Sequence, residues 1–229
     1  MYLIRIHILV VVHKKHVGFV LPLSRQNSMI FIAAFITASF LIGSIPFGYL
    51  ISKKLAGIDI QSIGSGNIGS TNVGRFVGRK AELITQCLDM AKGLVPTLAA
   101  LLIENYHSSM PVNQNFPLVA ALAAVCGHDF TPWLGFRGGK GVNTTLGATI
   151  LLAPFSTVAS VLVYFIVVRI SRYVALGSLG IGLVLPIFCW IEMGYGATFF
   201  YTLLVGALIF LRHLGNIQRL IAGIEDRKD

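Results

Sequence analysis

The chain has 229 residues and a net charge of +9, and 55% of its residues are hydrophobic while only 12% are charged. Soluble domains carry about 25% charged residues, so this composition argues strongly against a soluble globular protein. The mean hydropathy of +0.78 instead predicts an all-α, polytopic integral membrane protein. The chain is too short to add a separate soluble enzyme domain to several bilayer-spanning helices.

Residues 1–28 differ from the rest of the chain. A short apolar stretch at residues 8–12 is interrupted by His13-Lys14-Lys15-His16, so no span of membrane length forms there. The first uninterrupted apolar run begins at Met29. We therefore expect residues 1–28 to be an N-terminal extension, on the hypothesis that translation begins at Met29, and residues 29–229 to form a single membrane-embedded domain.

The apolar runs after Met29 predict about seven transmembrane helices, each needing about 20 residues to cross the bilayer. The fourth run is short for a full crossing, and Pro154 is expected to form the turn that ends it. In chain order the predicted spans cover residues 29–51, 82–103, 116–134, 142–153, 155–170, 173–191 and 196–212.

Basic residues separate the connecting segments into two groups. Lys and Arg are concentrated in segments 52–80, 135–141, 169–172 and 212–229, whereas the opposite loops near 104–115, 153–156 and 191–196 contain none. Cytoplasmic loops of membrane proteins carry the excess of Lys and Arg. The pattern predicts that the first group faces the cytoplasm, and it accounts for the positive net charge without a nucleic-acid partner.

Two of these cytoplasmic segments are rich in glycine and small polar residues. Residues 64–75 read GSGNIGSTNVGR, and residues 135–141 read GFRGGKG directly before a predicted span. Glycines allow backbone N–H groups to converge on a ligand, and a helix N-terminus adds partial positive charge. Hydroxyl, amide and cationic side chains then suit phosphate. The candidate donors are Ser65, Asn67, Thr71, Asn72, Arg75, Arg137 and Lys140, with the backbone of Gly138, Gly139 and Gly141.

Two such segments on one face predict either two phosphate sites or one phosphate beside a developing oxyanion. The alternative is a purely structural role, in which the glycines allow tight turns and close helix packing. That alternative explains single glycines better than it explains twelve consecutive residues with few large apolar side chains. Common nucleotide motifs do not apply: no strand precedes Gly64-x-Gly66-x-x-Gly69, and the Walker pattern around Lys140 lacks its first glycine and its Ser/Thr.

Three polar residues further along the chain admit two interpretations each. His213 and Asn216 are three positions apart and can share one helical face, although on their own they are better explained as part of an interfacial helix end. Ser178, early in the sixth predicted span, would alone be explained by helix packing. We keep both interpretations for all three residues at this point.

Ionisable residues also occur inside predicted spans. Asp89 and Lys92 are three apart on one helical face, and we expect them to neutralise one another within the bundle. His128 and Asp129 form a polar pair that is either structural or part of a site. The sequence shows no cluster of metal ligands, so we predict neither a metal nor another cofactor.

Taken together, these segments resemble the bacterial acyl-phosphate:glycerol-3-phosphate acyltransferases, the PlsY family. The resemblance extends from about residue 29 to residue 227. Several spaced motifs in the same order carry it, which makes the match specific. They are residues 43–48 (GSIPFG), the 65–75 segment, Asp89-x-x-Lys92-Gly93, Gly127-His128, residues 136–142 (FRGGKGV), residues 172–178 (RYVALGS) and Arg212-His213-x-x-Asn216-Ile217.

The resemblance implies a seven-helix enzyme of the bacterial inner membrane with its active site at the cytoplasmic face. Such an enzyme transfers a fatty acyl group from acyl phosphate to the 1-hydroxyl of glycerol 3-phosphate, which gives lysophosphatidic acid and phosphate in the first step of phospholipid synthesis. It uses neither acyl-CoA nor acyl carrier protein directly. We expect a monomer in contact with membrane lipids. A His-x4-Asp pair, on which the acyl-CoA-dependent acyltransferases rely, does not occur in this sequence.

The family's substrate-contacting positions fall on Ser65, Thr71, Arg75, Lys140, Ser178, His213 and Asn216, and the loop backbone is supplied by Gly138, Gly139 and Gly141. In the mechanism that this implies, Lys140 and the glycines hold acyl phosphate and stabilise the oxyanion. Arg75, Ser178, His213 and Asn216 hold glycerol 3-phosphate. Either a substrate phosphate or His213 removes the proton of the hydroxyl. The competing hypothesis is a small membrane transporter of a phosphorylated solute, which would predict internal repeats that this chain does not show.

Overall fold

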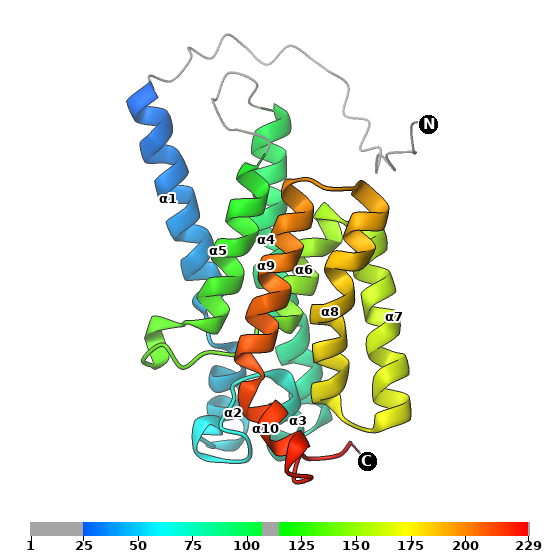
Figure 1. The fold of residues 1–229 in the computed structure, drawn as a ribbon. Coiled ribbons are helices and arrows are strands. Elements are labelled where there is room, and N and C mark those ends of the chain that lie inside the picture. Colours follow the sequence, from blue (N-terminus) through cyan, green and yellow to red (C-terminus); the bar gives the residue numbers. More distant parts are fainter. Residues whose placement is uncertain (1–24, 107–114, 229) are drawn as a thin grey trace.

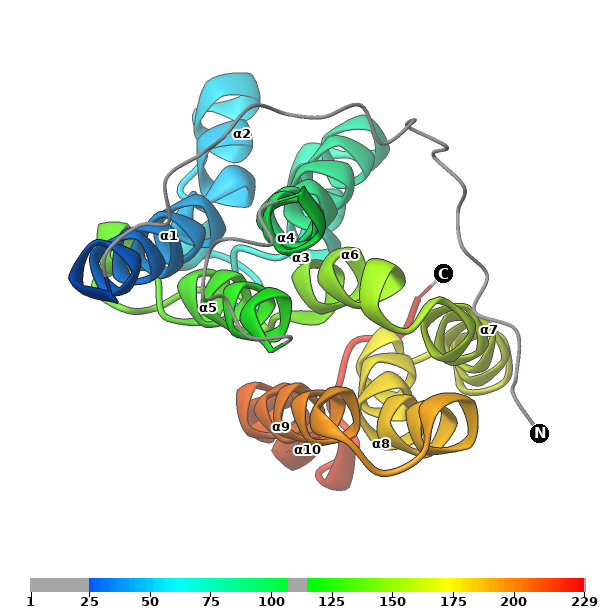
Figure 2. The same ribbon diagram turned by 90° about the horizontal axis from the view of Figure 1, so that it is seen from above.

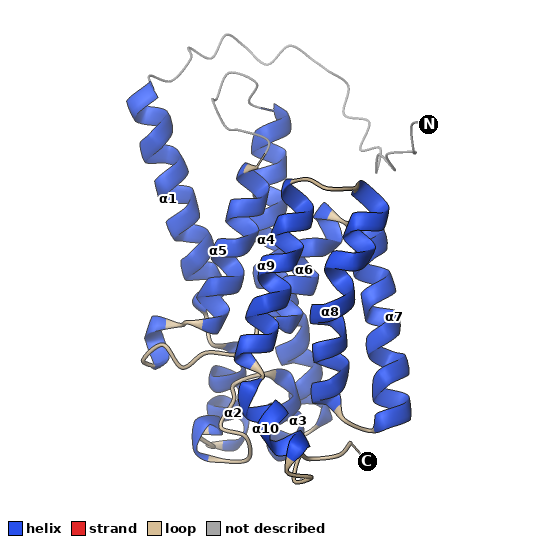
Figure 3. Cartoon of the chain, in the orientation of Figure 1, coloured by secondary structure: helices blue, strands red, loops and turns tan. Residues whose placement is uncertain are grey.

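The computed structural model describes residues 25–106 and 115–228. The regular secondary structure in these ranges consists of α-helices and 3₁₀ turns, with no β-strand (Figures 1 and 3). The fold class predicted from the sequence is therefore confirmed. The α-helices are α1 (Arg25–Ser44), α2 (Phe47–Ala56), α3 (Ser70–Val77), α4 (Arg79–Tyr106), α5 (Phe116–Asp129), α6 (Val142–Leu152), α7 (Pro154–Ser171), α8 (Val174–Met193), α9 (Ala197–Arg212) and α10 (Leu214–Ile221), with 3₁₀ turns at Ile60–Ser62 and Pro132–Leu134.

The long helices run roughly side by side, and the short helices α2, α3 and α10 gather at one end (Figure 1). The most extensively packed helix pairs are α7 with α8, α4 with α6, α1 with α5, and α8 with α9. Seen along the bundle, α6 lies between the group α1, α4 and α5 and the group α7, α8 and α9 (Figure 2). The structure thus has a central short helix whose first residue lies at the end where the short helices gather.

The outer surface of the bundle is apolar. Large hydrophobic side chains such as Phe165, Ile187 and Leu203 are exposed on α7, α8 and α9. Exposed apolar patches of this extent suit a helix surface that faces lipid. The chain is therefore a multi-pass membrane protein.

Within residues 25–106 and 115–228, four segments are long and apolar enough to cross a bilayer: Gln26–Ala56, Arg79–Asn105, Pro154–Ser171 and Val174–Met193. A fifth is formed if α9 and α10, which are bent by 54° relative to each other, are counted together. The helices α5 and α6 have 14 and 11 residues and are shorter than a full span. The count of seven spans therefore stays a prediction.

The first and third predicted spans differ in detail from the structure. The apolar run predicted as one helix over 29–51 is interrupted at Ile45–Pro46, because proline has no N–H to continue the helix and restricts the residue before it. The run predicted over 116–134 ends as an α-helix at Asp129 and continues into a 3₁₀ turn. Helix α1 begins at Arg25, within the predicted extension, whose residues 1–24 lie outside the described part of the chain. The domain boundary at residue 29 stays a prediction.

The four basic segments that the sequence assigns to one side do lie at one end of the bundle. Segment 52–80, segment 135–141, the α7–α8 turn and the C-terminal tail all lie at the lower end in Figure 1. The α6–α7 turn and the α8–α9 turn lie at the opposite end. This shared end positions the functional residues that are described below.

Glycines permit the closest helix contacts. At the α1–α5 contact, a Cβ atom added to Gly43 or to Gly127 would lie 2.1 Å from a backbone oxygen of the partner helix. The α4–α6 contact has the same reciprocal arrangement, where the corresponding distances are 2.1 Å for Gly93 and 2.0 Å for Gly147. Small residues at such crossings allow backbones to approach closely, which is a main source of helix association in membranes.

This packing predicts the effect of one methyl group. Gly127→Ala should lower the free energy of unfolding by about 1–3 kcal/mol, because the new Cβ forces α1 and α5 apart. The matched control is Gly196→Ala, since nothing lies within 4 Å of a Cβ at that extended position. Thermal unfolding in detergent measures both variants, and equal stabilities would contradict the proposed role of the α1–α5 contact.

Candidate functional site

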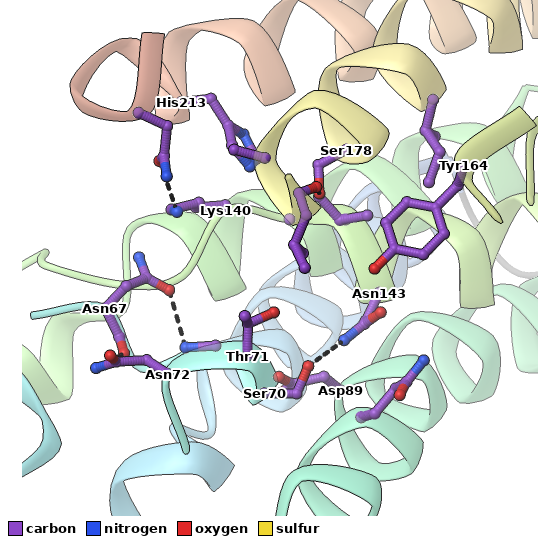
Figure 4. A pocket seen from close by; sticks show the side chains of 18 of the residues that line it. Asn67, Ser70, Thr71, Asn72, Asp89, Lys140, Asn143, Tyr164, Ser178 and His213 are labelled. Atoms are coloured by element: carbon purple, nitrogen blue, oxygen red, sulfur yellow. Dashed lines mark hydrogen bonds between the residues drawn. The ribbon is translucent and has the colours of Figure 1, made fainter. Parts of the chain in front are cut away.

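A cavity of about 160 Å³ lies at the end of the bundle where the basic segments gather (Figure 4). Its wall comes from the 65–75 segment, α4, the glycine-rich loop 135–141, α6, α7, α8, the α9–α10 junction and the tail. The polar part of the wall faces the loops, while Leu146, Val161, Phe165 and Ile181 make an apolar part between α6, α7 and α8.

The structure brings most of the predicted site residues to this one cavity. Ser65, Asn67, Thr71, Asn72, Arg75, Lys140, Gly141, Ser178, His213 and Asn216 line it. Gly138 and Gly139 are not part of the wall and lie behind it, against the end of α5. Segments that are far apart in the sequence therefore contribute to a single site.

Three hydrogen bonds join residues 61–70, in and next to the first glycine-containing segment, to residues 137–143, in and next to the second. Each bond joins residues more than 70 positions apart, so it sets tertiary geometry rather than local conformation. Figure 4 shows one of them, between Asn143 and Ser70. The donor–acceptor pairs are the Asn67 amide with the Gly138 carbonyl (3.4 Å), the Gln61 amide with the Arg137 carbonyl (3.1 Å), and the Asn143 amide with the Ser70 hydroxyl (3.2 Å).

Part of the first segment is a helix rather than the loop expected from its composition. Helix α3 begins at Ser70 directly after Gly69, so Thr71 and Arg75 project from a helix that ends at Val77. The first N–H groups of an α-helix point out of its N-terminal end and have no partner within the helix. The residues at the N-terminal end of α3 line the cavity. The start of α6, at Gly141 and Val142, lies on the same cavity.

The buried amide of Asn72 organises the turn before α3. Its Oδ1 accepts a hydrogen bond from the Ser65 backbone N–H at 3.2 Å, and its Nδ2 donates to backbone carbonyls of Ile60, Ile63 and Asn67 at 3.0–3.2 Å. Both ends of the amide are thus engaged by the protein backbone. Asn72 was predicted to contact substrate, and this geometry gives it the additional task of shaping the segment that carries Ser65.

The glycine-rich loop lies flat against the C-terminal end of α5. The Gly139 N–H donates to the His128 carbonyl at 3.0 Å. A Cβ added to Gly138 would lie 2.0 Å from that same carbonyl oxygen, and one added to Gly139 would lie 1.8 Å from Nε2 of His128. Gly141 has a φ of +71°, which favours glycine. The loop therefore requires glycine for close approach as well as for its backbone conformation.

Lys140 is one end of a chain of polar contacts that passes through Asn216 to Glu225. Its Nζ donates to Oδ1 of Asn216 at 2.7 Å, and Nδ2 of Asn216 donates to Glu225 at 2.6 Å. Burial lowers the pKa of Lys140 to about 8, the Glu225 carboxylate opposes this shift, and nearby guanidinium groups, first that of Arg219, add to it. Lys140 is thus a cation at neutral pH whose charge is lost within the mildly alkaline range.

His213 has one ring nitrogen fixed and the other available. Its Nδ1 lies 2.8 Å from the Ile209 carbonyl oxygen. A carbonyl only accepts hydrogen bonds, so Nδ1 carries the hydrogen and Nε2 of the neutral ring is an acceptor. Ser178 donates its hydroxyl hydrogen to the Val174 carbonyl at 3.1 Å, which leaves its oxygen as an acceptor toward the cavity.

The C-terminal tail contributes residues that the sequence interpretation missed. Glu225 lines the cavity, and Asp226 forms an ion pair with Arg75. Arg227 donates to the Tyr173 hydroxyl at 3.0 Å, which ties the tail to the start of α8. Asp226 thus reaches α3, and Glu225 bonds to Asn216 and Arg219 of the preceding helix α10.

The ionisable residues predicted inside the bundle lie in the cavity wall or next to it. Lys92 Nζ lies 3.0 Å from Oδ1 of the equally buried Asp89, which confirms the expected ion pair. It also donates at 2.9 Å to the carbonyl of Ile45, at the break between α1 and α2. Asp89 and His128 line the cavity, whereas Asp129 does not. Among the described residues no group of three or more His, Cys, Asp or Glu side chains is placed to hold a metal ion.

The geometry of Asn72 predicts a structural effect. Asn72→Ala would leave the Ser65 N–H and three backbone carbonyls without their partner, so we expect a lower thermal unfolding temperature in detergent. The cost should be about 1–3 kcal/mol, as for other unsatisfied buried groups. Asn105→Ala is a control, because that exposed amide bonds only to the carbonyl four residues earlier in α4. A stable Asn72 variant would show that the turn does not depend on this amide.

Comparison with known proteins gives consistent results. A profile of the family described as glycerol-3-phosphate acyltransferase matches residues 33–223. A glycerol-3-phosphate acyltransferase of Clostridium acetobutylicum is 45% identical over 195 residues, which cover 84% of this chain and 98% of that protein. One from Trichlorobacter lovleyi is 40% identical over 194 residues, which cover 84% and 95%.

Solved structures agree with these sequence matches. The crystal structure of PlsY (YgiH), an integral membrane glycerol 3-phosphate acyltransferase, in its glycerol 3-phosphate form matches with a TM-score of 0.79 and 34% identity, covering 87% of this chain and 96% of that one. The lysophosphatidic acid form of PlsY matches with a TM-score of 0.76 and the same identity, covering 86% and 95%.

Proposed function

The chain belongs to the glycerol-3-phosphate acyltransferase family, and we propose that it transfers a fatty acyl group from acyl phosphate to the 1-hydroxyl of glycerol 3-phosphate. The products are lysophosphatidic acid and inorganic phosphate. The relatives' names supply the acceptor, and the PlsY structures in glycerol 3-phosphate and lysophosphatidic acid forms supply its product. The choice of acyl phosphate as donor is our proposal for this chain.

One observation carries the proposal: a single cavity contains two separate groups of phosphate-binding character. Lys140 and the start of α6 form one group, and Arg75 with the start of α3 forms the other. Acyl phosphate and glycerol 3-phosphate each bring one phosphate. A cavity that binds both would hold the acyl carbon close to the acceptor hydroxyl, which converts a bimolecular encounter into an oriented reaction.

The donor needs activation of its carbonyl rather than an enzyme nucleophile. Phosphate is a good leaving group, so direct attack by the acceptor hydroxyl on the acyl carbon breaks the bond to phosphate. Lys140 and the backbone N–H groups where the glycine-rich loop reaches the cavity, at Lys140 and Gly141, would hold the donor phosphate and stabilise the negative charge that develops in the transition state. The low pKa of Lys140 fits a cation whose hydration has been replaced by protein contacts.

The acceptor would be held by Arg75, Ser178, His213 and Asn216, with Ser65, Asn67, Thr71 and Asn72 completing that side of the wall. Arg75 would pair with the phosphate of glycerol 3-phosphate. The hydroxyl and amide side chains would orient its glycerol part. The hydroxyl proton has two acceptors in this arrangement, a phosphate oxygen of a substrate or Nε2 of His213. The orientation of the His213 ring, with Nδ1 bonded to the Ile209 carbonyl, is compatible with the second because it leaves Nε2 as an acceptor.

The location of the reaction follows from the same arrangement. The basic segments at one end of the bundle support an active site at the cytoplasmic face of the bacterial inner membrane. The acyl chain would remain among lipids and membrane helices, and the apolar wall of the cavity between α6, α7 and α8 suits its first carbons. We include a monomer as the active unit in this proposal.

A direct assay tests this function. Purified protein supplied with acyl phosphate and labelled glycerol 3-phosphate should form lysophosphatidic acid without any added cofactor or carrier protein. Lys140→Ala should reduce turnover by at least about 10²-fold, as loss of a single oxyanion donor does in other enzymes. Lys54→Ala removes an exposed charge at the end of α2 and serves as the control.

Two outcomes would contradict this account. A loss of less than about tenfold in Lys140→Ala would remove Lys140 from the central role. Movement of glycerol 3-phosphate across proteoliposomes without product would instead identify the protein as a transporter.

The pKa of Lys140 predicts the alkaline limb of the activity. Because the charged ammonium binds the donor phosphate, kcat/KM for acyl phosphate should fall as the pH rises through about 8. Arginine stays protonated over this range, so any activity that Lys140→Arg retains should lose its alkaline limb. The alkaline limb is measured in the wild type and in Lys140→Arg by a pH profile from about 6 to about 10, which is centred on this pKa. An unchanged limb in Lys140→Arg would assign it to another group.

A further inference from the structure

Arg212, the last residue of α9, bonds to the backbone of the glycine-rich loop. Its Nε donates to the Gly139 carbonyl at 2.9 Å, and its Nη2 donates to the Gly138 carbonyl at 3.0 Å. The guanidinium carbon lies 5.4 Å from the centre of the Phe130 ring. Arg212 is not among the residues that line the cavity. One guanidinium group thus holds two consecutive peptide units of the loop from behind.

These bonds also fix the direction of the amides in the loop. In a planar trans peptide the carbonyl and the following N–H point in opposite directions. The Gly138 carbonyl faces Arg212, so the Gly139 N–H faces away from it and donates to the His128 carbonyl. The first peptide is therefore clamped between α9 and α5.

The second peptide follows the same geometry with a different result. Since the Gly139 carbonyl also faces Arg212, the Lys140 N–H must point away from Arg212. Lys140 and the next residue, Gly141, line the cavity. Arg212 therefore controls how the backbone enters the phosphate-binding part of the wall, just before α6 begins.

We propose that Arg212 is a positioning residue for the donor: it holds the glycine-rich loop in the conformation in which Lys140 and the loop amides receive the phosphate of acyl phosphate. This inference rests on the proposed function, in which that loop binds the donor. Arg212 acts through the loop and does not touch the substrate. The role differs from that of a simple interfacial anchor, which would affect both substrates equally.

The chemistry of the side chain explains why arginine is needed. Its planar fork presents two N–H groups at a fixed spacing, which matches two adjacent carbonyls. A lysine ammonium at the same position would carry the charge without the fork. Glycine at 138 and 139 allows the loop to lie close enough to α5 for both carbonyls to turn toward α9.

The test compares Arg212→Lys, Arg212→Ala and Arg169→Gln, where Arg169 is an exposed cation in the last turn of α7 at the same end of the bundle. We expect kcat/KM for acyl phosphate to fall by about 30- to 100-fold in both Arg212 variants, because small misplacements of reacting groups have effects of this size. The KM for glycerol 3-phosphate should change by less than about threefold, since Arg75 and its neighbours are untouched. Arg169→Gln should behave as the wild type.

Chemical rescue provides a readout that a merely structural role would not move. Millimolar guanidinium chloride should restore part of the donor kcat/KM of Arg212→Ala, whereas equal ammonium chloride should not. Size-exclusion profiles and thermal unfolding of each variant establish that it is folded. If Arg212→Ala does not fold, the substrate split in Arg212→Lys decides the matter.

Three results would overturn the inference: full activity in Arg212→Lys, equal losses toward both substrates, or no rescue by guanidinium of a folded Arg212→Ala. Lys140→Ala is assayed alongside to separate this inference from the proposed function. Normal activity in Lys140→Ala would overturn the assignment of the donor site itself. Inactive Lys140→Ala together with unaffected Arg212 variants would overturn only the role of Arg212.

Discussion

The site depends on hydrogen bonds that join two segments of the chain across the end of a helix bundle. Asn67 and Asn143 each bond to the opposite segment, over separations of 71 and 73 residues. Glycine-containing segments can adopt many conformations, so ordering them has a high entropic cost. These hydrogen bonds help to offset that cost. With them, Arg75 and Lys140 line the same cavity. The bundle supplies a rigid base, and the loops supply the groups that bind.

Charge is arranged in layers around this cavity. Lys140 and Arg75 lie at the cavity wall, and Arg212 lies behind the glycine-rich loop. Glu225 and Asp226 of the tail supply negative charge next to these cations, and Asp89 of the cavity wall pairs with the buried Lys92. The neighbouring carboxylates offset part of the repulsion among these cations. The remaining positive charge favours phosphate over uncharged ligands.

Much of this organisation was predictable from the sequence, because it rests on local composition and periodicity. The apolar runs gave the helices, the distribution of Lys and Arg gave the shared end, and the three-residue spacing gave the Asp89–Lys92 pair. The break at Pro46 was missed because mean hydropathy continues through it, although proline was a usable signal. Helix α3 was missed because its sequence, STNVGRFV, combines glycine and small polar residues that are weak helix formers.

Other features depend on contacts that no single-sequence pattern records. Asn72 has the composition of a ligand-binding residue, yet its amide is engaged by four backbone groups. Arg212 bonds to a loop 73 residues earlier in the chain, and Glu225 bonds to Asn216 only because the tail folds back onto α10. The resemblance to a family marks motifs that contain Asn72 and Arg212, but the contacts of these two side chains are defined only by the structure.

The most direct test of the central claim is an experimental structure of the purified protein with glycerol 3-phosphate bound. Our account predicts the ligand's phosphate within hydrogen-bonding distance of Arg75, displacing the carboxylate of Asp226, with the glycerol hydroxyls directed toward Lys140. A phosphate held elsewhere, or a glycerol moiety turned away from the glycine-rich loop, would contradict it.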